Sequence, residues 1–370
     1  MTRPYAVIAG GGTGGHVVPA LAVARALVAR GHAPDDIHFV GSRRGLEARL
    51  VPDAGFAITL LPGRGVARRL SWGSVTAVLA LVVAAGQAIV LLARWRPAVV
   101  ASVGGYASAP CVLAAILLRR PLVVAEQNAV PGLANRLGGR WARASAVAFA
   151  GTALPRAVVT GNPVRPEILA IDRSDEGRRK ARVELALPEG RLVIVAFGGS
   201  LGSRRINQAV SGLVALWAER SDLAVRHVIG ARDWDAFDAV GGAPRPGLLY
   251  QPVRYEDRMD LLLTAADVAV CRAGGSVAEL AVAGLPAVLV PLPGAPGDHQ
   301  TANARAFVDA GAAVMVADNE LTPARLATEL DALLGAPERL SAMADAVRGL
   351  AHPDAADQVA RLVEECAGRG

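Results

Sequence analysis

Two stretches of the chain share one pattern: a short apolar run, a cluster of glycines, and then apolar residues at helical spacing. The first is AVIAGGGTGGHVVPALAVARAL (6–27) and the second is RLVIVAFGGSLGSRRINQAVSGLVAL (191–216). A strand, a glycine loop and a helix open α/β domains in which helices cover a parallel sheet. Because the pattern recurs near the middle of the chain, the sequence predicts two such domains.

Other short apolar runs alternate with helical patterns and complete both predicted sheets. They lie at 5–9, 36–41, 98–104 and 121–127 in the first half, and at 223–230, 247–252, 266–275, 286–293 and 312–317 in the second. A length of 370 residues suits two domains, and the proline-containing stretch 160–170 is the natural linker. We predict an α/β architecture of two Rossmann-like, doubly wound domains facing across a cleft, with boundaries at 1–163 and 164–345. A C-terminal helix at 346–370 can pack back on the N-terminal domain.

The composition excludes several classes of protein. Lys180 is the only lysine, and it lies in a charged run, so neither a P-loop nor a Schiff-base enzyme fits. Cys111, Cys271 and Cys366 are too widely spaced for a zinc site or a disulfide framework, and no signal peptide precedes the first glycines, so a reducing cytosol is expected. The Asp233/Asp235 pair falls in an amphipathic helical pattern, which argues against a metal-dependent diphosphate site. No cofactor, metal or nucleic-acid partner is expected.

Residues 75–93 are uncharged and about long enough to span a bilayer, and they allow three interpretations. Arginines at both ends lack the asymmetry that orients a spanning helix. A helix buried in a domain core is the second interpretation. The third is a surface helix that docks on an anionic membrane. Its candidate membrane residues are Arg68, Arg69, Trp72, Arg94, Trp95 and Arg96.

The first glycine loop matches G-x-G-x-x-G through Gly10, Gly12 and Gly15, the fingerprint of a dinucleotide site. The predicted second strand ends near Arg43 and Arg44 and not at an acid, which leaves an NADP site open. His16 follows the glycines at the start of a helix, where an imidazole suits a general base.

Candidate site residues lie at or after the ends of five further predicted strands, at the edge where loops of a parallel sheet form a site. In the first half these are Tyr106, Glu126, Gln127, Asn128 and Asn135, and in the second half Ser200, Gly275, Ser276, Glu279, His299, Gln300 and Asn303. Each group also fits ordinary turn chemistry and helix capping. Ser200 lies in a glycine loop that suits a diphosphate, and Glu279 could accept both hydroxyls of a ribose or simply favour the helix dipole.

Taken in order, seven motifs resemble the MurG-type family of GT-B glycosyltransferases, which act in bacterial peptidoglycan synthesis. They are GGGTGGHVVPALA, GGYASAP, EQNAVPGLANR, GNPVR, FGGSLGSRRIN, CRAGGSVAELAVAGLPAVLVPLP and DHQTANA, between residue 10 and about 316. The resemblance implies inverting transfer of N-acetylglucosamine from UDP-N-acetylglucosamine to the muramyl sugar of undecaprenyl-pyrophosphoryl-MurNAc-pentapeptide. The N-terminal domain would bind the lipid acceptor and the C-terminal domain the donor.

The resemblance also implies roles for single residues. Thr13, Gly14, Gly15 and Asn128 would approach the transferred sugar or the acceptor, Tyr106 and Asn135 the acceptor, and Arg165 and Ser200 the donor diphosphate. Met259, Gly275 and Ser276 would hold uracil and ribose, Glu279 the ribose, and His299 and Gln300 the sugar hydroxyls. His16 or Glu126 is the candidate base.

A lipid acceptor favours membrane docking of the 75–93 helix, on the cytoplasmic face of the plasma membrane. Other proteins of cell-wall synthesis or division are expected partners. The rivals are another GT-B glycosyltransferase, a nucleotide-sugar epimerase of similar fold, an NADP oxidoreductase and a non-enzymic membrane scaffold.

Overall fold

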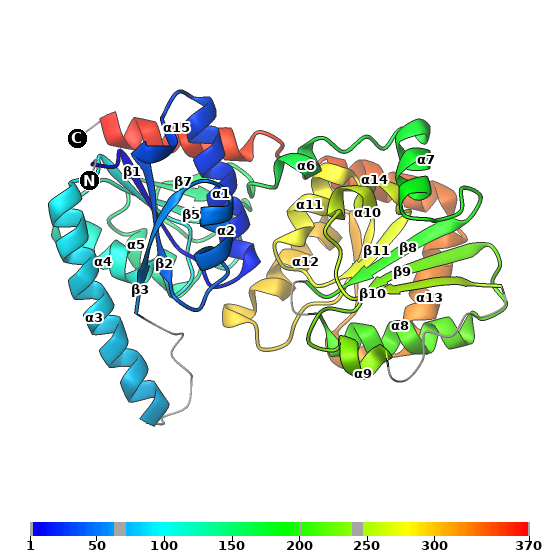
Figure 1. Cartoon of the computed structure of the whole chain (residues 1–370). Coiled ribbons are helices and arrows are strands. Elements are labelled where there is room, and N and C mark those ends of the chain that lie inside the picture. The colour runs from blue at the N-terminus through cyan, green and yellow to red at the C-terminus, as the bar shows by residue number, and fades with distance from the viewer. Residues whose placement is uncertain (1–2, 63–71, 200–201, 239–246, 369–370) are drawn as a thin grey trace. The chain divides into compact units, whose positions relative to one another are not determined.

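The chain forms two compact units, and the computed structural model describes residues 3–62, 72–199, 202–238 and 247–368 of it (Figure 1). Unit 1 consists of Met1–Arg165 together with His352–Gly370, and unit 2 is the continuous stretch Pro166–Ala351. Each unit is built on a parallel sheet flanked by helices. The predicted class of two Rossmann-like domains is therefore confirmed.

The sheet of unit 1 has the strand order β3-β2-β1-β4-β5-β6-β7, all parallel. Its strands are β1 (Ala6–Ala9), β2 (Ile37–Ser42), β3 (Ala57–Leu61), β4 (Val99–Ser102), β5 (Leu122–Glu126), β6 (Ala144–Val147) and β7 (Ala157–Val159). The helices are α1 (Gly14–Ala29), α2 (Glu47–Asp53), α3 (Trp72–Trp95), α4 (Ala109–Leu117), α5 (Leu133–Gly138) and α15 (Ala355–Gly368). The chain order reverses between β1 and β4, which is where ligands bind in open α/β sheets.

Alternation along β1 shows that both faces of this sheet are covered. Ala6 and Ile8 pack in one buried core with α1 and α15, whereas Val7 and Ala9 pack in another with α3 and α4. A strand buried on both sides reads as a continuous apolar run, which is why β1 was recognisable in the sequence.

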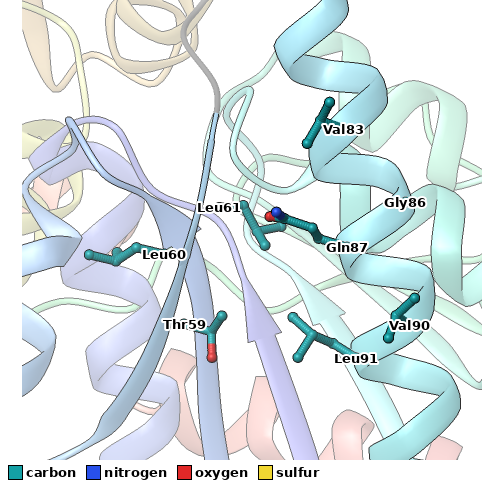
Figure 2. Close-up of a pocket in the computed structure, with 8 residues that line it drawn as sticks. All are labelled: Thr59, Leu60, Leu61, Val83, Gly86, Gln87, Val90 and Leu91. Atoms are coloured by element: carbon teal, nitrogen blue, oxygen red, sulfur yellow. The ribbon is translucent and has the colours of Figure 1, made fainter.

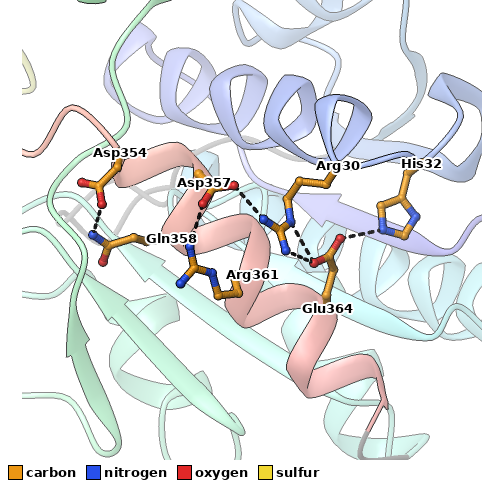
Figure 3. Close-up of polar contacts among 7 residues, drawn as sticks. All are labelled: Arg30, His32, Asp354, Asp357, Gln358, Arg361 and Glu364. Carbon is orange, nitrogen blue, oxygen red and sulfur yellow. Dashed lines mark hydrogen bonds and ion pairs between the residues drawn. The ribbon is translucent and has the colours of Figure 1, made fainter.

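The C-terminal helix α15 belongs to unit 1, where it packs against α1. Val359 and Val363 are buried in the core that they share with β1. At the rim of the contact, Arg30 lies 2.8 Å from Asp357 and 2.7 Å from Glu364, which also accepts from His32 at 3.1 Å (Figure 3). Burial raises the pKa of Glu364, but the hydrogen bonds from Arg30 and His32 outweigh it and lower that pKa overall. These charges fix the helix on the sheet.

Helix α3 buries one face in unit 1 and exposes apolar residues on the other. Ala84, Ala88, Leu92 and Trp95 are buried against the sheet and α4. Trp95, expected at a membrane surface, instead packs its ring on His38 at 4.4 Å between centroids. The helix rotation that buries Leu92 turns Trp95 inward as well, because residues three apart share a face.

The outer face of α3 carries Leu79, Val82, Val83 and Val90, all exposed, and Arg94 and Arg96 are exposed beyond it. No helix of the described part of the chain is both long and apolar enough to cross a membrane. Arg68, Arg69 and the side chain of Trp72 lie outside the described residues.

An apolar pocket of about 470 Å³ separates α3 from the edge strand β3. It is lined by Thr59, Leu60, Leu61, Val83, Gly86, Gln87, Val90 and Leu91 (Figure 2). The exposed face of α3 thus continues into a recess at the edge of the sheet.

The sheet of unit 2 has the strand order β10-β9-β8-β11-β12-β13, again all parallel. Its strands are β8 (Leu192–Phe197), β9 (Leu223–Val228), β10 (Leu249–Val253), β11 (Val268–Cys271), β12 (Ala287–Leu289) and β13 (Ala313–Met315). The helices are α6 (Pro166–Leu169), α7 (Asp175–Glu184), α8 (Arg204–Leu216), α9 (Trp234–Asp238), α10 (Met259–Ala265), α11 (Ser276–Ala283), α12 (His299–Asp309), α13 (Pro323–Leu334) and α14 (Pro337–Arg348). The order reverses between β8 and β11, as it does between β1 and β4 in unit 1.

Candidate active site

The loops after β1 and β4 meet at the reversal point of the first sheet, around His16. Gly105 has φ +77°, and a Cβ there would lie 2.5 Å from the Gly11 carbonyl oxygen and 3.2 Å from Cδ2 of His16. A Cβ on Gly104 would lie 3.4 Å from Cε1 of the same ring. The two loops therefore pack backbone to backbone, with the imidazole between them.

The loop after β5 supplies the partner of His16. Oε1 of Gln127 lies 3.1 Å from Nδ1 of His16, and Nε2 of Gln127 donates to the Ala125 carbonyl at 3.0 Å. Gln127 is buried, so a buried side-chain contact joins the loop after β5 to the His16 loop.

Glu126 sits beside this pair but has its two carboxylate oxygens fully engaged. Oε1 accepts from the backbone N–H and the side-chain amide of Asn128, both at 3.1 Å. Oε2 accepts from the Gly132 N–H and from Asn135 Nδ2, both at 3.0 Å. A buried carboxylate that accepts four hydrogen bonds has its acceptor positions filled, and it shapes the loop after β5.

Asn135 was expected to contact the acceptor, but its side chain is fully buried. Its amide nitrogen donates to Ala125 and Glu126, and its oxygen accepts from the Ser102 hydroxyl at 2.9 Å. The buried side chain of Asn135 therefore joins the ends of β4 and β5 by hydrogen bonds. The amide of Asn128 likewise faces Glu126.

Glu47, which the sequence analysis did not single out, supports the glycine loop from behind. Its buried carboxylate accepts from the Gly12 N–H at 2.7 Å and from the N–H and hydroxyl of Ser42, both at 2.8 Å. The Ser42 hydroxyl lies 2.9 Å from that of Tyr106. Many glutamates occur in the first turn of a helix, where they interact favourably with the helix dipole. The sequence therefore does not show that Glu47 also binds the glycine loop.

The solvent-accessible part of the first loop is the start of α1. Thr13 and Gly15 are exposed, Gly14 is half-buried, and Thr13 is the N-cap. The first N–H groups of a helix lack an intrahelical acceptor and favour an anionic group. Because Glu47 takes the Gly12 N–H, an anion at this loop would be held by the amides that follow.

In unit 2, the second glycine loop leads from β8 into α8. Ser203 caps the helix and accepts from the Ile206 N–H at 3.4 Å. Gly198 is half-buried and Gly199 exposed. Ser200 lies outside the described residues, and its predicted diphosphate contact stays a prediction.

The loops after β11 and β12 are joined by Asn303 and Arg272, and Gln300 holds the β12 loop to the start of α12. Gln300 accepts from the Leu292 N–H at 2.9 Å, and the buried Asn303 donates to the Ala273 carbonyl at 3.0 Å. Arg272 donates to the carbonyls of β12's loop and lies 2.6 Å from Asp318. Arg272 and its role were missed because its three partners come from distant parts of the sequence.

The remaining predicted donor residues occupy helix starts in unit 2. Gly275 is the N-cap of α11, Ser276 begins that helix, and Glu279 follows in its first turn. His299 begins α12, and its Nδ1 lies 2.9 Å from the Pro296 carbonyl. Met259 begins α10. Arg165 is half-buried at the end of the first segment of unit 1.

Two family models match the chain, the first within unit 1 and the second over unit 2 and the start of α15. The glycosyltransferase family 28 N-terminal domain matches residues 6–147, and the family 28 C-terminal domain matches residues 193–359. The chain belongs to glycosyltransferase family 28. The matched ranges include the His16 loop in the first model and the α8, α11 and α12 helix starts in the second.

Relatives of nearly the same length refine this membership. A protein of Alkalilimnicola ehrlichii, 44% identical over 99% of both chains, and one of Desulforudis audaxviator, 40% identical over 98% of this chain and 99% of the relative, share one name. That name is UDP-N-acetylglucosamine--N-acetylmuramyl-(pentapeptide) pyrophosphoryl-undecaprenol N-acetylglucosamine transferase. The crystal structure of Acinetobacter baumannii MurG matches with a TM-score of 0.76 and 31% identity over 98% of this chain and 99% of that one. The resemblance to the MurG type is confirmed.

The epimerase fold is related as well. UDP-GlcNAc 2-epimerase from Neisseria meningitidis matches with a TM-score of 0.67 at 12% identity, covering 99% of each chain. At that identity the likeness concerns the fold alone.

Proposed function

We propose that this protein is the transferase that moves N-acetylglucosamine from UDP-N-acetylglucosamine to the muramyl sugar of undecaprenyl-pyrophosphoryl-MurNAc-pentapeptide. The observation that carries the proposal is identity of 40–44% over nearly the whole chain to proteins that bear the name of this activity. The His16 loop and the helix starts of unit 2 supply groups suited to such a reaction.

Unit 2 would hold the donor. The start of α8 offers its N–H groups and positive dipole end to the diphosphate, and Glu279 offers a carboxylate to the ribose hydroxyls. His299 and Gln300 would bind the sugar hydroxyls, and Met259 with Gly275 and Ser276 would border the base and ribose. Arg165 and Ser200 remain proposed diphosphate contacts.

Unit 1 would hold the acceptor and the base. The acceptor hydroxyl oxygen forms a bond to the anomeric carbon while the bond from that carbon to the diphosphate oxygen breaks, and the electron pair leaves with UDP. His16 takes the hydroxyl proton, because Glu126 is saturated by four hydrogen bonds. The lipid diphosphate would lie at the start of α1, beside Thr13, Gly14 and Gly15.

We further propose that the exposed face of α3 docks on the cytoplasmic leaflet of the plasma membrane. Leu79, Val82, Val83 and Val90 expose apolar surface of the kind that monomeric proteins rarely keep in one patch. Arg94 and Arg96 add positive charge at one end, which suits anionic lipid. Partners among cell-wall synthesis or division proteins remain a proposal without a named surface.

The direct test is a transfer assay with labelled UDP-N-acetylglucosamine and a short-chain lipid-linked muramyl acceptor, with EDTA present. We expect labelled lipid and an equal amount of UDP. Conversion of UDP-N-acetylglucosamine to its epimer without acceptor would instead favour the epimerase rival. Absence of labelled lipid at saturating substrates would refute the proposal.

A further inference from the structure

We propose that Gln127 is a positioning residue that holds the neutral imidazole of His16 as its Nδ1–H tautomer, leaving Nε2 as the proton acceptor. The catalytic meaning of this inference rests on the proposed function. The tautomer itself does not, because it follows from contacts within unit 1.

The orientation of the Gln127 side chain is fixed by the backbone. A carbonyl oxygen can only accept a hydrogen bond, so the Gln127 atom 3.0 Å from the Ala125 oxygen must be the amide nitrogen. The other atom of the amide, Oε1, therefore faces His16 Nδ1 at 3.1 Å.

That orientation determines where the imidazole carries its proton. Oε1 of Gln127 cannot donate, so the contact is a hydrogen bond only when Nδ1 of His16 is protonated. In the alternative tautomer, the unprotonated Nδ1 of His16 would face Oε1 of Gln127, and both atoms are acceptors. The buried Gln127 oxygen would then have no hydrogen bond from the ring, which is unfavourable for a buried polar group. Neutral imidazole in water favours the Nε2–H form, so Gln127 reverses the preference that the ring has in solution.

The loop after β4 restricts the orientation of the His16 ring. Cβ positions on Gly104 and Gly105 would lie 3.4 Å and 3.2 Å from ring atoms of His16, so the β4 loop packs against the ring. Nε2 makes no hydrogen bond to any residue that the structure describes. The imidazole therefore presents an unprotonated nitrogen in a fixed direction, which is what a general base needs.

The Gln127 amide can accept a hydrogen bond from His16 in both the neutral and the protonated state of the ring. After Nε2 takes the hydroxyl proton, Nδ1 still donates to Oε1, so no reorientation accompanies proton transfer. The carboxylate of Glu47 is occupied by the N–H groups of Gly12 and Ser42, and that of Glu126 by groups of Asn128, Gly132 and Asn135. Gln127 is thus the side chain that sets the proton position on His16.

The decisive measurement is the ¹⁵N spectrum of the histidine rings in the whole protein without substrate. The chain has 6 histidines, and His16→Asn assigns the signal of interest. At a pH where His16 is neutral, we expect a protonated-type shift at Nδ1 and an unprotonated-type shift at Nε2. A proton on Nε2 would overturn the inference whether or not the transfer assay succeeds.

Gln127→Met keeps the length of the side chain and removes the acceptor. We expect the His16 signal to revert to the Nε2–H form and kcat to fall about ten- to a hundredfold with KM nearly unchanged. This is a partial loss of the roughly 10²- to 10⁴-fold that a general base contributes, because the base itself remains. Gln358→Met makes the same chemical change on α15, and it should alter neither the ¹⁵N signal of His16 nor kcat. An unchanged kcat in folded Gln127→Met would overturn the catalytic role, and if that variant fails to fold, the wild-type spectrum still decides the tautomer.

Discussion

Glu47 accepts a hydrogen bond from the backbone N–H of Gly12 at 2.7 Å, so a buried carboxylate on α2 holds the glycine loop that follows β1. The same carboxylate holds Ser42 at the end of β2. One side chain therefore sets the spacing between the ends of two neighbouring strands.

Glu47→Ala should destabilise unit 1, because it leaves the N–H groups of Gly12 and Ser42 without their acceptor. An unpaired buried donor costs about 1–3 kcal/mol, so we expect the melting transition of unit 1 to fall by roughly 5–15 °C in calorimetry. Asp53→Ala removes an exposed carboxylate from the same helix and should shift the transition little. Equal shifts for the two variants would contradict a structural role for Glu47.

His16→Ala and Glu126→Gln should separate chemistry from architecture. Removing a general base lowers kcat by about 10²- to 10⁴-fold, and His16→Ala should do so while lowering the melting temperature less than Glu126→Gln, because only the Gln127 oxygen loses its partner. Glu126→Gln replaces an acceptor of four hydrogen bonds and should lower the melting temperature of unit 1. Turnover of His16→Ala within about threefold of the parent would return Glu126 to consideration as the base.

Gly105→Ala should disturb the contact between the loops after β1 and β4. The added Cβ overlaps the Gly11 carbonyl, whereas Gly55, at a similar φ of +83° against +77°, has open space at its Cβ position. Gly55→Ala should therefore cost only the backbone strain, about 1 kcal/mol, and keep activity. Gly105→Ala should melt several degrees lower than Gly55→Ala and lose most of its transfer activity.

Acid should destabilise unit 2 through His227. This side chain is fully buried between Asn207 and Tyr250, and burial lowers its pKa to about 3. Between an unfolded pKa near 6.5 and that folded value, the unfolded chain binds a proton that the folded chain does not. Stability is therefore complete above about pH 6.5 and falls as the pH drops, by at most about 1.4 kcal/mol per pH unit.

His227→Gln removes the titrating imidazole. The melting temperature of unit 2 should then depend less on pH between about pH 4 and 6.5. The transition of unit 1 is the internal control, since its pH dependence should stay as in the parent. An identical slope in unit 2 before and after the substitution would show that other groups govern its acid sensitivity.

Membrane docking through α3 should depend on exposed apolar residues and on charge. Val82→Asp combined with Val90→Asp should reduce binding to phosphatidylglycerol vesicles, whereas Val183→Asp in unit 2 should not, although Val183 is 66% exposed and Val90 67%. Replacing Arg94 and Arg96 with glutamine should weaken binding about fivefold per residue, because a basic residue near an anionic surface contributes ~1 kcal/mol. Kinetics with a soluble acceptor should survive, and unchanged sedimentation of all variants would remove the docking proposal.

Much of the fold and part of the site could be read from the sequence. Buried parallel strands such as β1 and β11 are continuous apolar runs, and glycines after them mark the loops, so His16 and Gln300 fall at strand ends by order along the chain alone. The strands β3, β6 and β7 were missed. The residues of β3 and β7 are mostly exposed or half-buried and lack that signal, and the buried β6 is a short run of small residues interrupted by Ser145.

The roles of neighbouring polar residues could not be read in the same way. Glu126 and His16 look equally suited to proton transfer in the sequence, and our proposal of His16 rests on the hydrogen bonds that Asn128, Gly132 and Asn135 give to Glu126. Trp95 has arginines on both sides, which suggested a membrane rim, but the pairing of α3 with the sheet decides that it points inward. Such choices depend on residues distant in sequence.

The discontinuity of unit 1 has a consequence for synthesis on the ribosome. Unit 2 is one continuous stretch of chain, so its sheet can form completely as soon as residues 166–351 have left the ribosome. The first sheet emerges earlier, yet the core that β1 shares with Val359 and Val363 lacks one wall until α15 has been made. The half of the molecule that is translated first is therefore the last to finish folding, and until then it exposes apolar surface of the kind that chaperones bind.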